Sequence, residues 1–423
     1  PLAPAINPDG TLPVTAVSPG TLPNPNWYRV AKEADATTKN NRLLSTAFLE
    51  YEIFKGLTLK TTLNAELGQV LFSNFVPSTS AAVNQAVPRA SGDLTVNNNQ
   101  FTTWLSENTA TYKNSIGEHD FELLGGFSAQ RFRSDISNVA ATNFPNDVVR
   151  TLSAATTFTP TSDIQEWSLL SYLARVNYNY KGKYFLTAAI RRDGSSRFGS
   201  DNKWGNFPSI SAGWIVSDES FMSNIKAISL LKLRTSYGET GNNNIGNYTY
   251  YANVSASGAG GSNNYAFNNA LVSGNAVTTL ANATLGWEKT RQFDVGFDLG
   301  LLNNRLTFGY DYYTKTTDGL LFNVPVPTYT GFTNFIANIG KIKFWGHEFT
   351  VSSQNTVGAF KWNTDFNISF NRNIVQQLGT ANAALGGGTS RNITKVGEPL
   401  GMLWGYVFNG IYMTKADYDA SPK

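Results

Sequence analysis

The residues that could perform metal or acid–base chemistry in this chain are few and widely separated. Its two histidines, His119 and His347, lie far apart, and neither belongs to an H-x-x-x-H or H-E-x-x-H motif that would suit zinc. Both fall on the mostly apolar face of an expected strand, near one end, which favours interfacial or packing roles. The chain has no cysteine, so disulfides, cysteine metal ligands and thiol nucleophiles are excluded. The sequence therefore predicts no metal site and no cofactor.

Carboxylates and glycines offer two further candidate sites, and both have a simpler explanation. Glu288, Asp294 and Asp298 share one face of an expected strand and resemble a set of catalytic carboxylates. A strand whose polar residues alternate with apolar ones produces such sets automatically. Gly258–Gly261 lies in a glycine-rich stretch without the lysine and following helix of a phosphate-binding loop, so it is expected to be a loop tip. The sequence thus predicts that the chain is not an enzyme.

A binding role is better supported by aromatic residues that stand among asparagine, serine and threonine in two long connections. Aromatic faces beside amide and hydroxyl groups suit sugars or peptides, through stacking and hydrogen bonds. Packing between loops, or contact with a partner protein, explains the same residues equally well. The candidate substrate or lid contacts are Tyr248, Tyr250, Tyr251, Tyr265, Tyr329, Phe332 and Phe335.

The elements expected to position these residues are β-strands of about ten residues. In 57–67, apolar residues occupy every second position except Thr61, while polar residues such as Thr58, Lys60 and Thr62 occupy the positions between them. Ten alternating residues are enough to cross a bilayer in a tilted strand. Thirteen segments are expected to be strands: 42–54, 57–67, 101–113, 119–133, 168–180, 184–192, 208–216, 230–239, 287–299, 306–312, 343–354, 359–371 and 402–412.

The connections between these segments alternate between short turns and long loops. The short ones are 55–56, 114–117, 181–183, 301–304 and 355–358, and the long ones are 68–100, 134–165, 194–206, 241–285, 317–342 and 372–401, with 218–228 intermediate. In an antiparallel meander, this alternation places every short turn at one end of the sheet, as in a transmembrane β-barrel. A soluble sandwich also has alternating strands but gives no reason for alternating connection lengths. Aromatic residues beside the short turns, including Tyr178, Tyr184 and Trp362, are expected to form an interfacial girdle.

Composition agrees with a barrel and narrows the alternatives. Charged residues make up 15% and aromatic residues 13% of the 423 residues, and no apolar run is long enough for a membrane-spanning helix. A net charge of +3 without a basic run gives no reason to expect nucleic-acid binding. The chain starts with proline, no signal peptide follows, and 419–423 is polar and turn-like. Both ends are therefore expected to be cuts within a longer mature protein.

Three adjacent blocks of sequence go beyond fold class. They read YFLTAAIRRDGSSRFG over 184–199, WGNFPSISAGW over 204–214 and LKLRTSYGETGN over 231–242. Flanking pieces include WEKT at 287–290, NIGKIKFWGHE at 338–348 and VGEPLG at 396–401. Together they closely resemble the SusC/RagA family of TonB-linked outer-membrane transporters of Bacteroidota.

The resemblance implies a complete protein with a 22-stranded barrel, of which residues 1–423 form one part. An N-terminal plug domain, a TonB-contacting region and the final C-terminal strands would lie outside this chain. The implied function is TonB-dependent import of a nutrient across the Gram-negative outer membrane, with a glycan favoured as substrate and an oligopeptide second. The implied partners are TonB, a SusD-like surface lipoprotein acting as a lid, outer-membrane lipid and, in a dimer, a second SusCD pair. A siderophore or vitamin receptor, and a structural or secretion-associated barrel, remain as alternatives.

The most specific block has a physical interpretation of its own. Asp193 and Gly194 followed by two serines are expected to make a turn, because glycine tolerates positive φ and Asp and Ser bond to nearby backbone. Arg192 follows Ile190 on the outward face, and Arg191 on the inward face is expected to pair with a carboxylate. We interpret this outer loop as structural rather than ligand-binding; its family-motif residues are Arg191, Asp193, Gly194, Ser195, Ser196, Arg197, Phe198 and Gly199.

Overall fold

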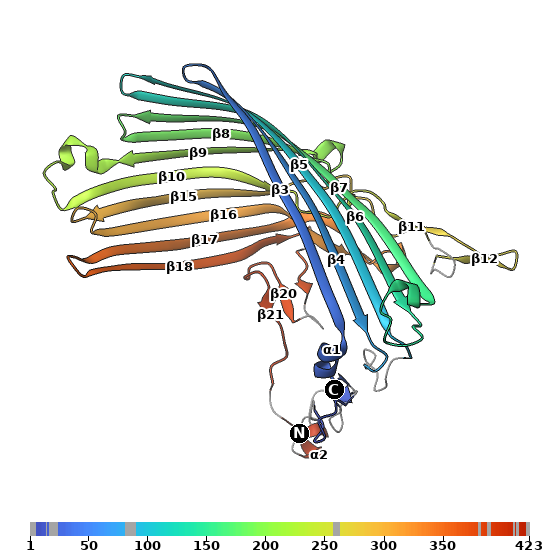
Figure 1. The fold of residues 1–423 in the computed structure, drawn as a ribbon. Coiled ribbons are helices and arrows are strands. Elements are labelled where there is room, and N and C mark those ends of the chain that lie inside the picture. The colour runs from blue at the N-terminus through green and yellow to red at the C-terminus, as the bar shows by residue number, and fades with distance from the viewer. Residues whose placement is uncertain are drawn as a thin grey trace. The chain divides into compact units, whose positions relative to one another are not determined.

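The computed structural model describes residues 6–13, 15–16, 24–80, 90–256, 263–379, 382–386, 391–408, 411 and 414–419. This part of the chain contains one large sheet of twelve strands, in the order β18-β17-β16-β15-β10-β9-β8-β7-β6-β5-β4-β3 (Figure 1). The strands are β3 (Asp35–Phe54), β4 (Leu57–Val76), β5 (Asp93–Ile116), β6 (His119–Thr142), β7 (Thr157–Tyr180), β8 (Tyr184–Ser195), β9 (Trp204–Ile215), β10 (Ile228–Asn242), β15 (Glu288–Leu301), β16 (Leu306–Pro325), β17 (Asn334–Val357) and β18 (Lys361–Leu378).

Smaller elements lie in the connections. Seven of them form three small sheets: β11 (Val254–Ala256) with β14 (Asn275–Val277), β12 (Tyr265–Phe267) with β13 (Ala270–Val272), and β19 (Leu385–Gly386) with β20 (Asn392–Thr394) and β21 (Met402–Leu403). The pair β1 (Thr15–Ala16) and β2 (Asn24–Pro25) precedes α1 (Trp27–Glu33), and α2 (Lys415–Asp419) lies near the C-terminus. The 3₁₀ turns are η1 (Leu152–Ala154), η2 (Ser200–Asn202), η3 (Val216–Asp218), η4 (Ser220–Met222) and η5 (Thr328–Thr330). Within the described residues, no helix is both long and apolar enough to cross a membrane.

The alternating sequence pattern gives the sheet one apolar and one polar face, because successive side chains of a strand point to opposite sides. One row of paired residues across five strands shows this clearly: Leu233, Phe297, Tyr310, Phe349 and Ile368 are successive partners on β10, β15, β16, β17 and β18. We call the side that carries this row the belt face and the opposite side the polar face. The same apolar pairing recurs between β3 and β4.

The belt face is exposed rather than packed against a second sheet. Phe366 is 56% exposed and Leu63 is 55% exposed, although both lie in the middle of long strands. Buried apolar side chains gather instead near the long connections, for example Phe75 with Phe144 and Ile342 with Val375. A soluble sandwich would bury its apolar face between two sheets, so this arrangement fits a membrane-facing wall.

Twelve of the thirteen predicted strands are confirmed at their predicted positions. Most of them are longer than predicted. Several run for 20 to 24 residues, so predicted loop 68–100 shrinks to 77–92 and 317–342 to 326–333. Past the belt, polar stretches still pair through their backbone, which needs no apolar alternation. The predicted strand at 402–412 is wrong. Its apolar residues come in consecutive runs, its first two residues form β21, and part of it lies outside the described residues.

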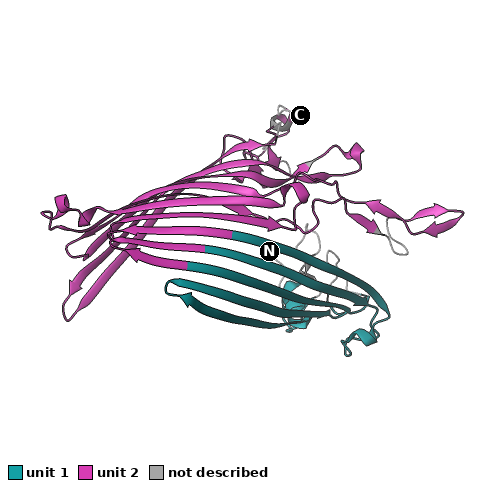
Figure 2. Ribbon diagram, turned by 90° about the horizontal axis from the view of Figure 1, so that it is seen from above, with its two compact units in different colours: residues 1–111, 125–172 teal, residues 112–124, 173–423 magenta. Residues whose placement is uncertain are grey.

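The chain divides into two compact units (Figure 2). Unit 1 comprises residues 1–111 and 125–172 and has a core around Phe75, Leu94 and Phe144. Unit 2 comprises residues 112–124 and 173–423 and has two cores, one around Phe198 and the other around Ile342. Every site described below lies within unit 2.

Candidate functional site

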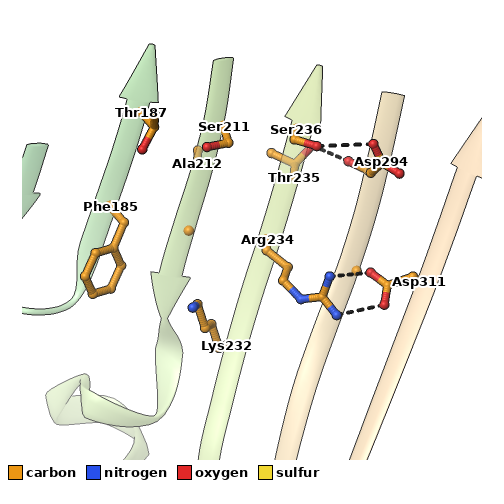
Figure 3. Close-up of a pocket in the computed structure, with 12 residues that line it drawn as sticks. Phe185, Thr187, Ser211, Ala212, Lys232, Arg234, Thr235, Ser236, Asp294 and Asp311 are labelled. Atoms are coloured by element: carbon orange, nitrogen blue, oxygen red, sulfur yellow. Dashed lines mark hydrogen bonds and ion pairs between the residues drawn. The ribbon is translucent and has the colours of Figure 1, made fainter. Parts of the chain in front are cut away.

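A hollow of about 270 Å³ lies on the polar face of β8, β9, β10, β15 and β16 (Figure 3). Arg234 of β10 is at its centre and forms ion pairs with two aspartates. Its guanidinium donates to Asp298 of β15 at 3.1 and 3.2 Å, and to both carboxylate oxygens of Asp311 of β16, one at 2.8 Å. Fixed charges of this kind hold a polar wall in one conformation.

Gly296 makes this ion pair possible. Arg234 pairs with Gly296 on β15, and Gly296 pairs with Asp311 on β16, so the arginine reaches across a strand to its second neighbour. A Cβ added at Gly296 would overlap the Asp311 carboxylate. The missing side chain of Gly296 therefore leaves the gap through which Arg234 and Asp311 meet.

A second polar hollow, of about 500 Å³, lies on the polar face near the short turn after β5. Glu122 is at its centre and accepts hydrogen bonds from Arg175 and Asn177, both at 3.0 Å. Lys113 lies 3.0 Å from the other oxygen of the same carboxylate. In each hollow a cation thus pairs with a carboxylate, Arg234 with Asp311 in the first and Arg175 with Glu122 in the second, which suits a water-lined surface that contacts polar solutes.

The three carboxylates that resembled a catalytic set are each held by separate donors. Asp298 pairs with Arg234, as described above, and Asp294 accepts from Ser236 at 3.2 Å and from Gln292 at 2.9 Å. Glu288 accepts from the backbone N–H of Leu321 at 2.8 Å and from the Asn242 side chain at 2.6 Å. This geometry gives each carboxylate a structural partner.

Both histidines pack within aromatic clusters. His119 lies 2.7 Å from the Tyr178 hydroxyl and stacks on Tyr180, with ring centroids 4.6 Å apart. His347 lies 3.0 Å from the Tyr310 hydroxyl. His119 begins β6 as predicted, but placing His347 near a strand end is wrong, because β17 extends ten residues beyond it on one side and more on the other. No group of three or more possible metal ligands occurs within the described ranges.

Aromatic rings also line the short-turn end of the belt face, where the interfacial girdle was predicted. Tyr180, Tyr184 and Trp214 form a continuous row with successive centroids 6.0 and 6.1 Å apart. The Tyr184 hydroxyl and the Trp214 N–H both donate to Glu219 in the turn between β9 and β10. These bonds, that of Tyr184 foremost, lower the pKa of Glu219 below its ordinary value.

At the opposite end, the motif residues converge on a packed cluster that we call the outer-loop hub. Phe198 and Leu285 are fully buried in it, and Trp287 packs against Phe198 with centroids 5.4 Å apart. The complete hub consists of Phe198, Ile245 and Leu285 with Tyr250, Trp287, Leu321 and Ile336 around them. The hub therefore joins the connection after β8, the connection after β10 and the hairpin of β16 and β17.

Hydrogen bonds fix the same segments to one another. Arg197 donates to the Asn247 side chain at 3.0 Å and to the Asn243 carbonyl at 3.2 Å, and burial lowers the pKa of its guanidinium. The Asn338 amide exchanges two bonds with the backbone of Gly286, and the Trp287 N–H donates to a carbonyl of the 196–203 turn at 3.0 Å. The 184–199 block and the flanking pieces at 287–290 and 338–348 thus meet in space.

The predicted turn at Asp193 and Gly194 is wrong. Both residues belong to β8 and pair with β9, and the turn begins only after Ser195. Gly194 is needed for space rather than for positive φ, because an added Cβ would lie 2.8 Å from the Trp204 ring. Arg191 pairs with a carboxylate as predicted, and its partner is Asp193 at 2.7 Å.

The candidate contact aromatics occupy three different settings. Tyr250 and Tyr251 lie together, with centroids 4.0 Å apart, and burial raises the pKa of Tyr250 to about 12. Tyr265 lies in β12, and Tyr329, in η5, is 88% exposed. Tyr248 and Tyr251 are also exposed, whereas Tyr250, Phe332 and Phe335 are half-buried. The glycine-rich tip 258–261 lies outside the described residues.

The Arg234 ion pair was not predicted. Its arginine stands within the LKLRTSYG block, and Asp311 follows a tyrosine in β16, so each fell on a predicted polar face. What no pattern indicated was that the two side chains meet across Gly296. The sequence feature that could have indicated this contact is Gly296 itself, which lies between two polar-face carboxylates of β15, Asp294 and Asp298.

Comparison with known proteins identifies the family of this chain. The profile of the family described as "TonB dependent receptor-like, beta-barrel" matches residues 4–421. The chain belongs to this TonB-dependent receptor family. Membership implies a Gram-negative outer-membrane location.

Two curated relatives and one solved structure show how specific this membership is. The chain is 37% identical over 396 residues to TonB-dependent receptor P39 of Formosa agariphila, covering 92% of this chain and 36% of the relative. It is 32% identical over 352 residues to TonB-dependent receptor SusC of Bacteroides thetaiotaomicron, covering 78% of this chain and 33% of the relative. The RagAB peptide transporter structure superposes with a TM-score of 0.81 at 26% identity, covering 93% of this chain and 43% of that chain.

These matches confirm the SusC/RagA resemblance and set its extent. The relatives are receptors and transporters rather than enzymes, in agreement with the sequence prediction. The chain spans about two fifths of the length of the curated relatives that it matches.

Proposed function

We propose that this TonB-dependent receptor chain forms part of the wall of an outer-membrane importer that takes up an oligomeric nutrient. The observation that carries the proposal is the family match over 4–421 together with the TM-score of 0.81 to a SusC-type structure, the RagAB peptide transporter. In this assignment the belt face contacts lipid, and the polar face, with its paired charges around Arg234 and Glu122, lines the conduit. Transport requires no covalent chemistry from these residues.

The whole of 1–423 would belong to the barrel domain, and the remaining strands, the plug domain and the TonB-contacting region would lie outside it. The twelve-stranded sheet supports this assignment, because both of its edge strands, β3 and β18, are long and lack a second neighbour within the described sheet. In a bilayer such edges must be paired, so further strands have to complete the wall. TonB would supply energy, and a SusD-like lipoprotein would cap the long-loop end.

The outer-loop hub has a structural role in this proposal, and the exposed aromatics contact substrate or lid. Most family-motif residues between Arg191 and Gly199 already contact other parts of the chain, whereas the side chains of Tyr329, Tyr265 and Tyr251 are exposed. We favour an oligosaccharide as substrate and an oligopeptide second. The aromatic and amide side chains suit both, and similarity to RagAB, which is a peptide transporter, supports the peptide.

Uptake by cells of the native host tests this function. Labelled oligosaccharide and oligopeptide pools are supplied to cells with the full-length receptor, to cells lacking TonB and to cells lacking the neighbouring SusD-like gene. We expect uptake of one pool, lost in both deletions and reduced by Tyr329→Ala. The matched control is Phe360→Ala, which is also highly exposed but lies at the short-turn end. Uptake of an iron chelate that needs no lipoprotein would refute the proposal in favour of a siderophore receptor.

A further inference from the structure

Five basic side chains form a band on the belt face, where a membrane-facing wall should be least charged. They are Lys289 and Arg291 on β15, Lys341 and Lys343 on β17, and Arg372 on β18. We call them the basic band. They differ from Arg234 and Arg175, which lie on the polar face and pair with carboxylates there.

The strand register places the basic band on the belt face. Arg291 lies six residues along β15 from Phe297, and Lys343 lies six residues along β17 from Phe349, so each points to the same side as those apolar residues. Lys289, Lys341 and Arg372 are likewise an even number of residues from a belt-face residue of their own strand. No register shift interrupts the pairing of β15 or β17 with β16 between these positions.

The basic band begins where the apolar belt ends, on the side of the long loops. Arg291 is ten residues from Leu301, the last residue of β15 before the short turn. Ten residues at about 3.4 Å each, in a strand tilted by about 45°, rise about 24 Å, which matches the roughly 25 Å height of an apolar barrel belt. The band therefore lies at the level of the lipid headgroups on the long-loop side.

Carboxylates of the chain neutralise this band incompletely. Arg291 pairs with Glu239 at 3.1 Å and approaches Asp318 at 3.8 Å, and Lys341 lies 3.9 Å from the same Asp318. Lys343 lies over the Trp345 ring at 5.9 Å from its centroid. Within the described residues, neither Lys289 nor Arg372 has an ion-pair partner. Five cations against two carboxylates leave an excess of three positive charges on a surface that faces lipid.

We propose that the basic band binds the phosphate groups of an anionic glycolipid in the outer leaflet of the outer membrane. Lysine and arginine at a bilayer boundary extend their charged ends toward the headgroups and attract anionic lipid. Phosphates would satisfy Lys289 and Arg372, and the flat guanidinium of Arg372 can bind a phosphate through two hydrogen bonds. The proposal concerns the lipid-facing side and does not depend on which nutrient is carried.

Native mass spectrometry of the purified full-length receptor tests the proposal by measuring affinity for bisphosphorylated lipid A and for its dephosphorylated form. The test variant is Lys289→Gln/Lys343→Gln/Arg372→Gln. Its matched control is Lys55→Gln/Lys226→Gln/Lys361→Gln, which removes the same charge at or beside the short turns. Circular dichroism is used to check that each variant is folded. The temperature at which heating changes the mobility of the barrel on a gel serves as a second check.

We expect the test variant to bind bisphosphorylated lipid A roughly tenfold or more weakly than the wild type, with the control unchanged. Dephosphorylated lipid A should bind the wild type as weakly as bisphosphorylated lipid A binds the test variant. Equal affinity of the test variant, the control and the wild type would overturn the proposal. So would displacement of lipid A by millimolar inorganic phosphate, since the band would then be a free-phosphate site.

Discussion

Removing the Arg234 side chain should destabilise the barrel wall through the charges that it leaves behind. In Arg234→Met, Asp298 and Asp311 lose the four hydrogen bonds that the guanidinium provides on the polar face. Exposed ion pairs contribute about 0.2–1 kcal/mol, and breaking a buried pair costs about 3–5 kcal/mol. These side chains are between 29% and 39% exposed, so an intermediate loss of about 2 kcal/mol is expected.

The assay is urea unfolding of the refolded full-length receptor in detergent or lipid vesicles, followed by tryptophan fluorescence. Lys232→Met is the matched control, because Lys232 lines the same hollow but has no carboxylate partner among the described residues. It should change the free energy of unfolding by less than about 0.5 kcal/mol. Adding Asp298→Asn and Asp311→Asn to Arg234→Met should restore most of the lost stability, since the unpaired charges are then gone. If the triple variant were no more stable than Arg234→Met, the ion-pair explanation would be refuted.

Three further predictions concern the hub, the gap glycine and the short-turn end. Phe198→Ala should destabilise the outer-loop hub by about 3–5 kcal/mol and speed amide exchange there, whereas Tyr329→Ala, at an exposed position, should leave exchange unchanged. Gly296→Ala should displace Asp311 and lower the free energy of unfolding by about 1–3 kcal/mol. A free energy of unfolding equal to that of the wild type would show that Gly296 is not needed to make room for the Arg234–Asp311 ion pair. The lowered pKa of Glu219 means that its hydrogen bonds stabilise the fold above the ordinary pKa of 4.5 and are lost as pH falls through the lowered value. Acid should therefore destabilise the wild type more than Glu219→Gln, and identical pH profiles would exclude this contribution.

The sequence predicted the faces of the strands more reliably than their ends. Alternation in 57–67 and 359–371 identified the belt face, because apolar side chains are required only where a strand crosses lipid. Beyond the belt, β5 continues through Val96-Asn97-Asn98-Asn99, where backbone pairing and side-chain hydrogen bonds such as that from Gln69 to Asn98 maintain the strand without apolar alternation. Such stretches carry no periodic signal, so the long loops were predicted longer than they are.

The candidate sites could be predicted only in features that depend on a single strand, such as the face on which a residue lies. Asp298 was placed on its polar face from its own strand, but its bond with Arg234 depends on the register of β10 against β15. The role of Gly194 was missed for the same reason, because the Trp204 ring that requires a glycine there comes from the neighbouring strand. Side-chain contacts between strands depend on register, which a single sequence does not determine.

The central claim is that the two faces of the sheet meet different solvents, lipid on the belt face and water on the polar face. Residues 1–423 contain no cysteine, so single cysteines can be introduced along β15 of an otherwise cysteine-free full-length receptor, at Gln292, Phe293, Asp294, Val295 and Phe297. Labelling of the full-length receptor in membranes with a charged, water-soluble maleimide tests the claim directly. We predict rapid labelling at 292 and 294 and almost none at 293, 295 and 297. Equal labelling at all five positions would contradict a membrane-facing belt.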